Sequence, residues 1–168
     1  MRAGERGRRE GGFTYMGALF LVGLMGLAAA GAGSSWSLAS QRARERELLW
    51  VGNQYARALK AYHDQSPGAR QYPSRLQDLV EDKRFPTTRH HLRRLYADPV
   101  TGEPFDVVLH TDGRIAGVRS RSGAAPLKQD NFPLKWRAFK GMARHADWQF
   151  IADGHPSKAP SAAAARSP

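Results

Sequence analysis

A long stretch without charge near the N-terminus constrains this chain of 168 residues more than any other feature. From Phe13 to Gly33 no side chain is charged, whereas four arginines precede the run at positions 2, 6, 8 and 9. A helix of that length reaches across a bilayer core of about 30 Å and satisfies its own backbone polar groups in lipid. The basic flank favours a cytoplasmic N-terminus, with the rest of the chain across the membrane.

The uncharged run alone leaves two interpretations open. It is typical of a signal anchor that stays in the membrane as a single-pass helix. It is also compatible with a secretory signal that is removed, because Ala28-Ala29-Ala30 and Ala30-Gly31-Ala32 both have the small residues of a cleavage site. The second interpretation gives a secreted or bitopic periplasmic protein, with a mature N-terminus between Gly31 and Ser34.

The residues directly before the run distinguish these alternatives. Gly11-Gly12 is followed at once by Phe13-Thr14 and the apolar stretch. This arrangement resembles the prepilin signal of type IV pilins and of type II secretion pseudopilins. The resemblance implies a leader over residues 1–12, cleavage after Gly12 by the prepilin peptidase, and methylation of the new N-terminal Phe13. It also implies a transmembrane helix over residues 13–35 in the bacterial inner membrane, with a periplasmic domain beyond it.

One residue departs from the family pattern. The family usually has a Glu at the fifth mature position, which is thought to pair with the N-terminal amine of a neighbouring subunit, and Gly17 stands there in this chain. An amine without such a partner is costly in apolar surroundings. We therefore expect a minor subunit that assembles beside Glu-bearing pseudopilins. The small residues Gly17, Gly23 and Gly26 permit close approach of neighbouring helices.

The segment after the apolar run reads as an amphipathic continuation of the same helix over residues 36–64. Apolar residues recur there at steps of three or four, which predicts one buried stripe formed by Leu48, Val51, Tyr55, Leu59 and Tyr62. Most of the basic residues fall elsewhere and are expected in solvent. Ser66-Pro67-Gly68 then predicts the end of the helix.

Residues 65–153 are expected to form a small periplasmic domain of the α+β class, in which the long N-terminal helix packs on an antiparallel sheet. Tyr72-Pro73 and the loop from Asp98 to Pro104 resemble segments of major-type pseudopilins. The expected elements are helices over 73–80 and 89–96, strands over 105–110 and 115–119 joined by an Asp-Gly turn, a loop over 120–132, a helical turn over 139–143 and a third strand over 146–151. A disordered tail is expected over residues 154–168.

Composition and spacing argue against an enzyme. The chain has no cysteine, so it has no disulfide and no Cys nucleophile. His90 and His91 are adjacent and cannot chelate on one helical face, and no serine lies in a nucleophile-elbow context. We expect no catalytic residues and no cofactor, and instead a fibre subunit whose partners are the membrane, other pseudopilins, the prepilin peptidase and the assembly platform of the secretion system.

The formal net charge of +11 raises anions as a further class of partner. A competence-type pilin that binds DNA would contact phosphates through five candidate arginines, Arg89, Arg93, Arg94, Arg119 and Arg121. No aromatic platform is interleaved with these arginines in the sequence, so a solvated basic surface is the favoured interpretation.

Calcium enters only through the resemblance, because major pseudopilins bind Ca²⁺ in a late loop of the domain. The corresponding loop here offers Ser120, Ser122, Asp130 and Asn131, among three cations at 119, 121 and 128. Calcium needs several oxygen ligands, commonly with two or more carboxylates. We therefore expect no calcium site in this loop.

Overall fold

The computed structural model describes residues 11–153, apart from the side chains of residues 11–14 and 27–36. Most of the expected leader and the whole expected tail over 154–168 lie outside the described residues. The chain divides into two compact units, Met1–Ser40 and Gln41–Pro168. We call the described residues 41–153 of the second unit the head. The fold is α+β with a three-stranded antiparallel sheet, which confirms the predicted class.

Helix α1 runs from Gly11 to Asp64 and forms the spine of the head with its C-terminal part. All five residues of the predicted apolar stripe are at most 5% exposed. The interleaved basic residues are exposed, as a helix with one apolar face requires. Gly52, Ala56 and Ala58, which flank the stripe on its two edges, are also buried, so the head packs around more of α1 than the stripe alone predicts.

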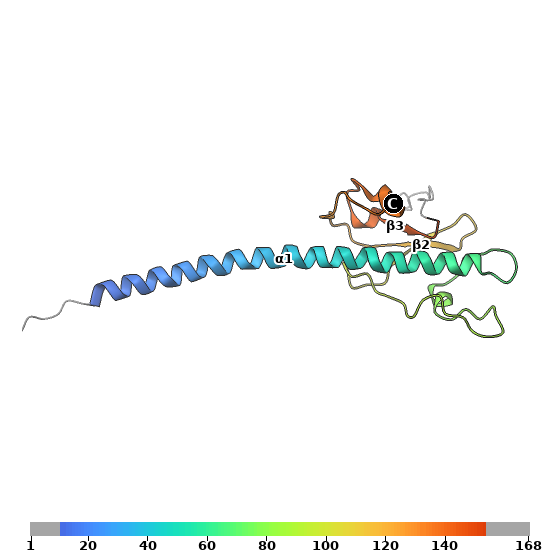
Figure 1. The fold of residues 1–168 in the computed structure, drawn as a ribbon, viewed down its shortest axis with the longest axis horizontal. Coiled ribbons are helices and arrows are strands. Elements are labelled where there is room, and N and C mark those ends of the chain that lie inside the picture. The colour runs from blue at the N-terminus through green and yellow to red at the C-terminus, as the bar shows by residue number, and fades with distance from the viewer. Residues whose placement is uncertain (1–10, 154–168) are drawn as a thin grey trace, which may run out of the picture. The chain divides into compact units, whose positions relative to one another are not determined.

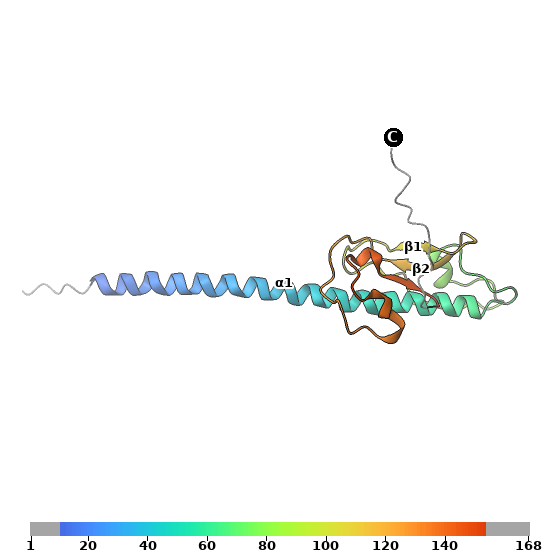
Figure 2. The ribbon, with the colours of Figure 1, turned by 90° about the horizontal axis from the view of Figure 1, so that it is seen from above.

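The sheet contains β1 (Asp106–Leu109), β2 (Ile115–Arg119) and β3 (Gln149–Ile151) in that order. The β1–β2 hairpin turns at the predicted Asp-Gly pair, where Gly113 has a φ of +77° and the Asp112 side chain accepts a hydrogen bond from the Arg114 amide. Figure 1 shows the sheet on one side of α1 and the segment over 66–97 on the other. Figure 2 shows β1 and β2 from above, running alongside the C-terminal part of α1.

An aromatic cluster joins β3 to the helix. It consists of Phe132, Trp136, Phe139, Trp148 and Phe150, all at most 9% exposed. The rings of Phe139 and Trp148 are stacked, and the Phe150 ring meets those of Trp136 and Phe139 edge to face. This cluster can reach α1 closely because the helix presents a glycine, Gly52, directly opposite the Phe150 ring.

Two expected helices in the first half of the head differ from the structure. The segment over 73–80 contains only a short 3-10 helix, η1 (Leu76–Leu79). The helix expected over 89–96 is absent, and that expectation was wrong. The amides of His91 and Leu92 both donate to the Leu79 carbonyl, and residues 82 and 89 form an isolated antiparallel bridge, so these backbone groups are not free for helical bonds.

The last elements are shifted from their expected places. The predicted helical turn over 139–143 lies earlier, as the 3-10 helix η2 (Leu134–Phe139). The predicted strand over 146–151 is reduced to β3, because η3 (His145–Asp147) occupies its first residues. β3 begins at Gln149, the residue that follows Trp148, whose ring is stacked in the aromatic cluster.

Candidate functional site

The candidate interaction site is the helical segment Tyr15–Gly26, which we call the apolar arm. Every residue in it is exposed. Its eight large apolar side chains are 54–73% exposed: Tyr15, Met16, Leu19, Phe20, Leu21, Val22, Leu24 and Met25. Because consecutive helical residues point in different directions, these side chains cover all faces of the helix. A helix that is apolar on all sides is typical of one that is buried all round.

The three glycines of the arm have open surroundings. A Cβ placed on Gly17, Gly23 or Gly26 meets nothing within 4 Å. Contacts within the described residues therefore do not require glycine at these positions. Their small size leaves room for a neighbouring helix to approach closely.

The predicted leader cleavage point, between Gly12 and Phe13, lies at the N-terminal end of the described residues. Gly12 and Phe13 belong to α1, but their side chains lie outside the described residues, as do those of 14 and 27–35 within the expected transmembrane segment. Among the described residues, no helix combines the length and the hydropathy that a membrane span requires.

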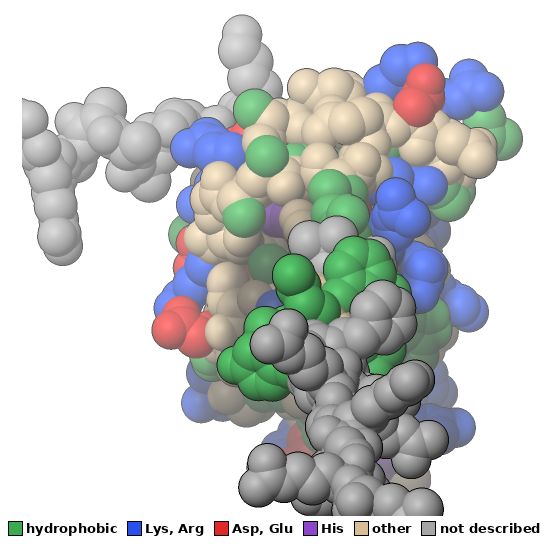
Figure 3. All heavy atoms as spheres, turned by 90° about the vertical axis from the view of Figure 1, so that its left-hand side faces the viewer, with side chains coloured by type: hydrophobic (Ala, Val, Ile, Leu, Met, Phe, Trp, Pro, Cys, Tyr) green, Lys and Arg blue, Asp and Glu red, His purple; other side chains and the backbone are tan. Residues whose placement is uncertain are grey.

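The start of the head is fixed by a buried acid on α1. Glu45 is 3% exposed and accepts hydrogen bonds from the backbone amides of Leu127 and Lys128, at 2.6 and 3.0 Å. His145 from η3 lies 3.2 Å from the same carboxylate and is also buried. Figure 3 shows the head from its N-terminal side, with many Lys and Arg side chains on its surface. Glu45 thus ties the loop before η2 to the helix.

The structure separates the five candidate arginines into two groups. Arg119 and Arg121 are partly neutralised, because both pair with Asp106 and Arg121 also lies 3.6 Å from Glu103. Arg89, Arg93 and Arg94 lie on the irregular segment after η1, and no carboxylate pairs with them among the described residues. Of these five arginines, only the second group has no acidic partner among the described residues and offers its charge to an anion.

Aromatic rings accompany that second group, contrary to the expectation from the sequence. The Arg89 guanidinium lies 4.1 Å from the centre of the Phe85 ring, and that of Arg94 lies 5.1 Å from the centre of the Tyr96 ring. The exposed Trp50 of α1 packs edge-on against Tyr96. The sequence could not reveal this pairing, because an irregular backbone, not a helix or a strand, brings each ring under its arginine.

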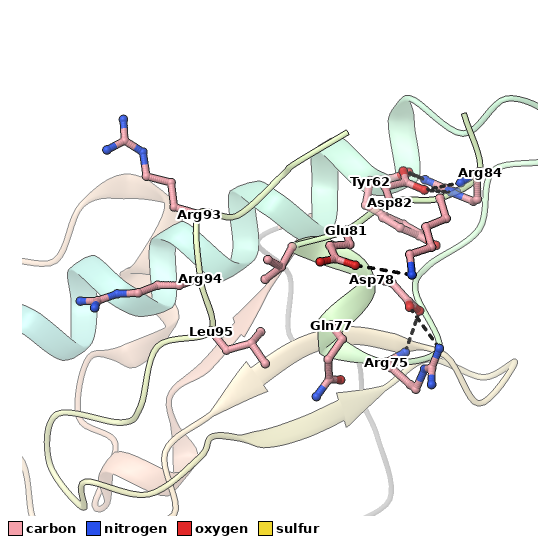
Figure 4. Close-up of a pocket in the computed structure, with 12 residues that line it drawn as sticks. Tyr62, Arg75, Gln77, Asp78, Glu81, Asp82, Arg84, Arg93, Arg94 and Leu95 are labelled. Carbon is pink, nitrogen blue, oxygen red and sulfur yellow. Dashed lines mark hydrogen bonds and ion pairs between the residues drawn. The ribbon is translucent and has the colours of Figure 1, made fainter. Parts of the chain in front are cut away.

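A groove of about 700 Å³ lies between η1, the end of α1 and the segment over 93–95. Five cations and three carboxylates line it. Figure 4 shows each acid joined to a cation of its own segment, whereas Arg93 and Arg94 extend away from these pairs. The corresponding distances are 3.8 Å for Arg75–Asp78, 3.5 Å for Lys83–Glu81 and 2.8 Å for Arg84–Asp82.

The Asp82–Arg84 pair closes the end of α1. Asp82 is 1% exposed, and Arg84 binds both of its carboxylate oxygens. The same guanidinium donates to the Tyr62 carbonyl and lies 3.5 Å from the centre of the Tyr62 ring. The Arg84 guanidinium, helped by His91, holds the pKa of the Asp82 carboxyl far below its ordinary value. A cation at the C-terminal end of a helix also satisfies a carbonyl that has no partner within the helix.

The side-chain oxygens of the late loop that carries Ser120 and Asp130 do not converge on one point. The Ser120 hydroxyl is buried and donates to the Asp98 carboxylate at 2.6 Å, whereas Asp130 is exposed and pairs with Lys140 at 2.7 Å. Among the described residues, no group of three or more His, Cys, Asp or Glu side chains is placed to hold a metal ion. Asp98 instead organises the predicted turn, because it also accepts from the Val100 amide and the Thr101 hydroxyl.

The sequence interpretation overlooked Glu45 and Asp82 as organising residues. A signal for Glu45 was present, because it lies three residues before Leu48 and therefore on the apolar stripe. Asp82 carries no such signal, since its partners come from an irregular segment.

Comparison with known proteins gives no match to a family model, a curated protein or a solved structure.

Proposed function

We propose that this chain is a pseudopilin-like structural subunit of a type II secretion fibre, or of a related type IV pilus-like fibre, with a role in protein export. In this proposal residues 13–35 are a single-pass helix in the bacterial inner membrane, and the head is periplasmic. The observation that carries the proposal is the apolar arm, whose large side chains are exposed on every face of the helix.

The exposed apolar side chains of the arm need an apolar environment that removes them from water. Burial of apolar surface is worth about 25 cal/mol per Å², so eight exposed large side chains favour any apolar host strongly. A lipid bilayer is one host, and the same helix of neighbouring subunits is another. A subunit that is held in a membrane and then moved into a fibre needs one apolar surface that can be buried first in lipid and then against neighbouring helices. The open glycines at 17, 23 and 26 suit the second host.

The head agrees with the same proposal. A helix with a single buried stripe packs on a small antiparallel sheet, and the loop from Asp98 to Pro104 is built around its own side-chain hydrogen bonds. These features support the resemblance to pilin-like domains on which the interpretation of the leader rests. We propose no catalytic role and no cofactor. The proposed partners are other pseudopilins, the prepilin peptidase, the membrane and the assembly platform. Gly17 favours co-assembly with Glu-bearing subunits.

The leader provides the test. Produced together with a prepilin peptidase, the chain is expected to have a mature N-terminus at methylated Phe13, measured by mass spectrometry of the purified protein. The Gly12→Leu variant is expected to keep its leader, because the peptidase requires the small residue before the cleaved bond. Ala30→Leu is the matched control, since it blocks only ordinary secretory cleavage near Ala30. A mature N-terminus between Gly31 and Ser34, or leader loss in Gly12→Leu, would refute the proposal.

A second candidate function is supported by the arginine–aromatic pairs. We propose as the alternative that the head binds single-stranded DNA, as a competence-type pilin would. Arg89 over Phe85 and Arg94 over Tyr96 combine a phosphate contact with a ring face, and the neighbouring Arg93 is exposed and without an acidic partner among the described residues. Stacking on aromatic rings and contacts to phosphates are the two terms on which sequence-tolerant single-strand binding depends.

Titration of the detergent-solubilised chain with a labelled oligonucleotide at several salt concentrations tests this alternative. We expect Arg93→Gln/Arg94→Gln to weaken binding and to lower the slope of log affinity against log salt by about 0.7 for each lost contact. The control pair Arg119→Gln/Arg121→Gln removes the same charge from arginines already paired with acids and is expected to have a smaller effect. No binding at the lowest salt would eliminate the DNA-binding function.

A further inference from the structure

Three exposed arginines lie within five residues where the head begins. We call Arg42, Arg44 and Arg46 the arginine collar, and all three are exposed. No carboxylate pairs with them among the described residues. The acid between them, Glu45, is turned into the head, where two backbone amides and His145 hold its carboxylate. Glu47, the other nearby acid, is exposed and forms no ion pair with the collar among the described residues, so the three guanidinium groups are left without a direct acidic partner.

The distance from the expected cleavage point predicts where the collar lies relative to a bilayer. No side chain from Gly11 to Gln41 is charged, so Arg42 is the first charge that follows Phe13. At about 1.5 Å per helical residue, the segment from Phe13 to Arg42 is roughly 43 Å long. A bilayer measures about 40–45 Å when its headgroup regions are included. A helix whose N-terminus lies at one headgroup layer therefore brings Arg42 to the other.

We propose that the arginine collar binds the phosphate groups of anionic phospholipids in the periplasmic leaflet. This inference rests on the proposed membrane helix. Guanidinium groups match phosphate oxygens with two parallel hydrogen bonds, so arginine suits such contacts better than lysine. Two further residues, Leu127 and Lys128, lie next to the collar because their backbone amides bind the Glu45 carboxylate. Leu127 is 39% exposed and supplies an apolar side chain, and Lys128 supplies a further cation.

Lipid fits this surface better than nucleic acid does. The collar follows directly on a long uncharged helix, whereas the arginine–aromatic pairs of the head belong to the segment over 85–96. A combination of cations with an exposed leucine is typical of groups that sit at a membrane interface. The consequence is a retention device, because a subunit that leaves the membrane for a fibre must give up these phosphate contacts.

Native mass spectrometry of the full chain tests the collar. The chain is inserted into nanodiscs made of equal parts phosphatidylglycerol and phosphatidylcholine, and the lipids retained on release are counted. We expect the natural chain to retain phosphatidylglycerol preferentially. The triple variant Arg42→Gln/Arg44→Gln/Arg46→Gln is expected to lose this preference by roughly tenfold or more, since each cation near an anionic surface contributes about fivefold.

The control variant is Arg89→Gln/Arg93→Gln/Arg94→Gln, which removes the same charge from the head and is expected to leave the preference unchanged. Equal retention of the two lipids by the natural chain, or equal losses in both triple variants, would overturn the collar. Alkaline carbonate washing of membranes separates the two proposals. A collar that fails leaves the chain resistant to the wash, whereas a chain that washes off overturns the membrane helix and the collar together.

Discussion

Gly52→Val is expected to destabilise the head by about 3 kcal/mol, at the upper end of the range for an overpacked core. A Cβ at this position would lie 2.4 Å from the Phe150 ring, well inside van der Waals contact. Removal of a glycine from a helix normally stabilises it by up to about 1 kcal/mol. Here the steric term is larger than the propensity term, so the sign of the change is destabilising.

The Phe150 ring cannot move aside at low cost. It is completely buried, and its ring centre lies 5.2 Å from those of both Trp136 and Phe139. A shift of Phe150 therefore has to displace two further rings that are themselves buried. The alternative, a shift of the helix backbone, would disturb the stripe residues on either side of Gly52, Val51 and Tyr55, which are at most 2% exposed.

Urea unfolding of the full chain in detergent, followed by near-ultraviolet circular dichroism of the aromatic cluster, measures this effect. Gly68→Val is the matched control, because a Cβ at Gly68 meets nothing within 4 Å, and it is expected to leave the midpoint nearly unchanged. Phe150→Ala removes the ring that clashes but is itself costly, so the test is a double-mutant cycle: adding Gly52→Val to Phe150→Ala is expected to cost much less than adding it to the natural chain. Equal stability of Gly52→Val and the natural chain would show that the helix and the aromatic cluster are not in this contact.

Local sequence patterns were enough to predict the buried face of α1 and the β1–β2 hairpin. The spacing of Leu48, Val51, Tyr55, Leu59 and Tyr62 is a property of the sequence alone, and it located the buried face of α1 correctly. The Asp112-Gly113 turn likewise placed the β1–β2 hairpin, because a positive φ is cheap only for glycine. Both signals act over a few neighbouring residues, which is why they can be read without the structure.

Long-range packing decided what the sequence left open. Gly52 reads as a weak point in a helix until Phe150, almost a hundred residues later, is placed against it. The segment over 89–96 has the spacing of a short helix, but its amides at 91 and 92 are taken by the Leu79 carbonyl. The arginine–aromatic pairs were missed for the same reason, since an irregular backbone sets their geometry. The apolar arm is the opposite case, because its composition alone predicts that it needs an apolar partner, and its large side chains are exposed.

Asp82→Ala is expected to destabilise the head by about 3–5 kcal/mol, the usual result of removing one partner of a buried ion pair. The loss would leave the Arg84 guanidinium, whose side chain is 26% exposed, without its main acceptor. Arg84 then holds the Tyr62 carbonyl and the Ser66 hydroxyl less firmly, and these are the contacts that close the end of α1. His91, which is 3.0 Å from the same carboxylate, loses its partner as well.

The same pair makes the stability of the head dependent on pH in acid. Because Arg84 lowers the pKa of the folded Asp82 carboxyl below its ordinary value of 3.8, the unfolded chain takes up a proton at a higher pH than the folded chain does. The unfolded state thus binds more protons in this range, and the stability contributed by Asp82 is complete above about pH 4 and is lost as the pH falls. The natural chain is therefore expected to lose unfolding free energy steeply below pH 4.

Asp82→Asn isolates this effect, because it keeps the shape of the side chain but has no proton to gain. The variant is expected to be less stable than the natural chain at pH 7 and to approach it as the pH falls towards 3. Asp130→Asn is the matched control, since Asp130 is exposed and its pair with Lys140 lies at the surface, where ion pairs are worth about 0–1 kcal/mol. Urea midpoints measured from pH 7 to pH 3 provide the comparison. A natural chain and an Asp82→Asn variant whose stabilities fall in parallel would place the acid sensitivity outside the Asp82–Arg84 pair.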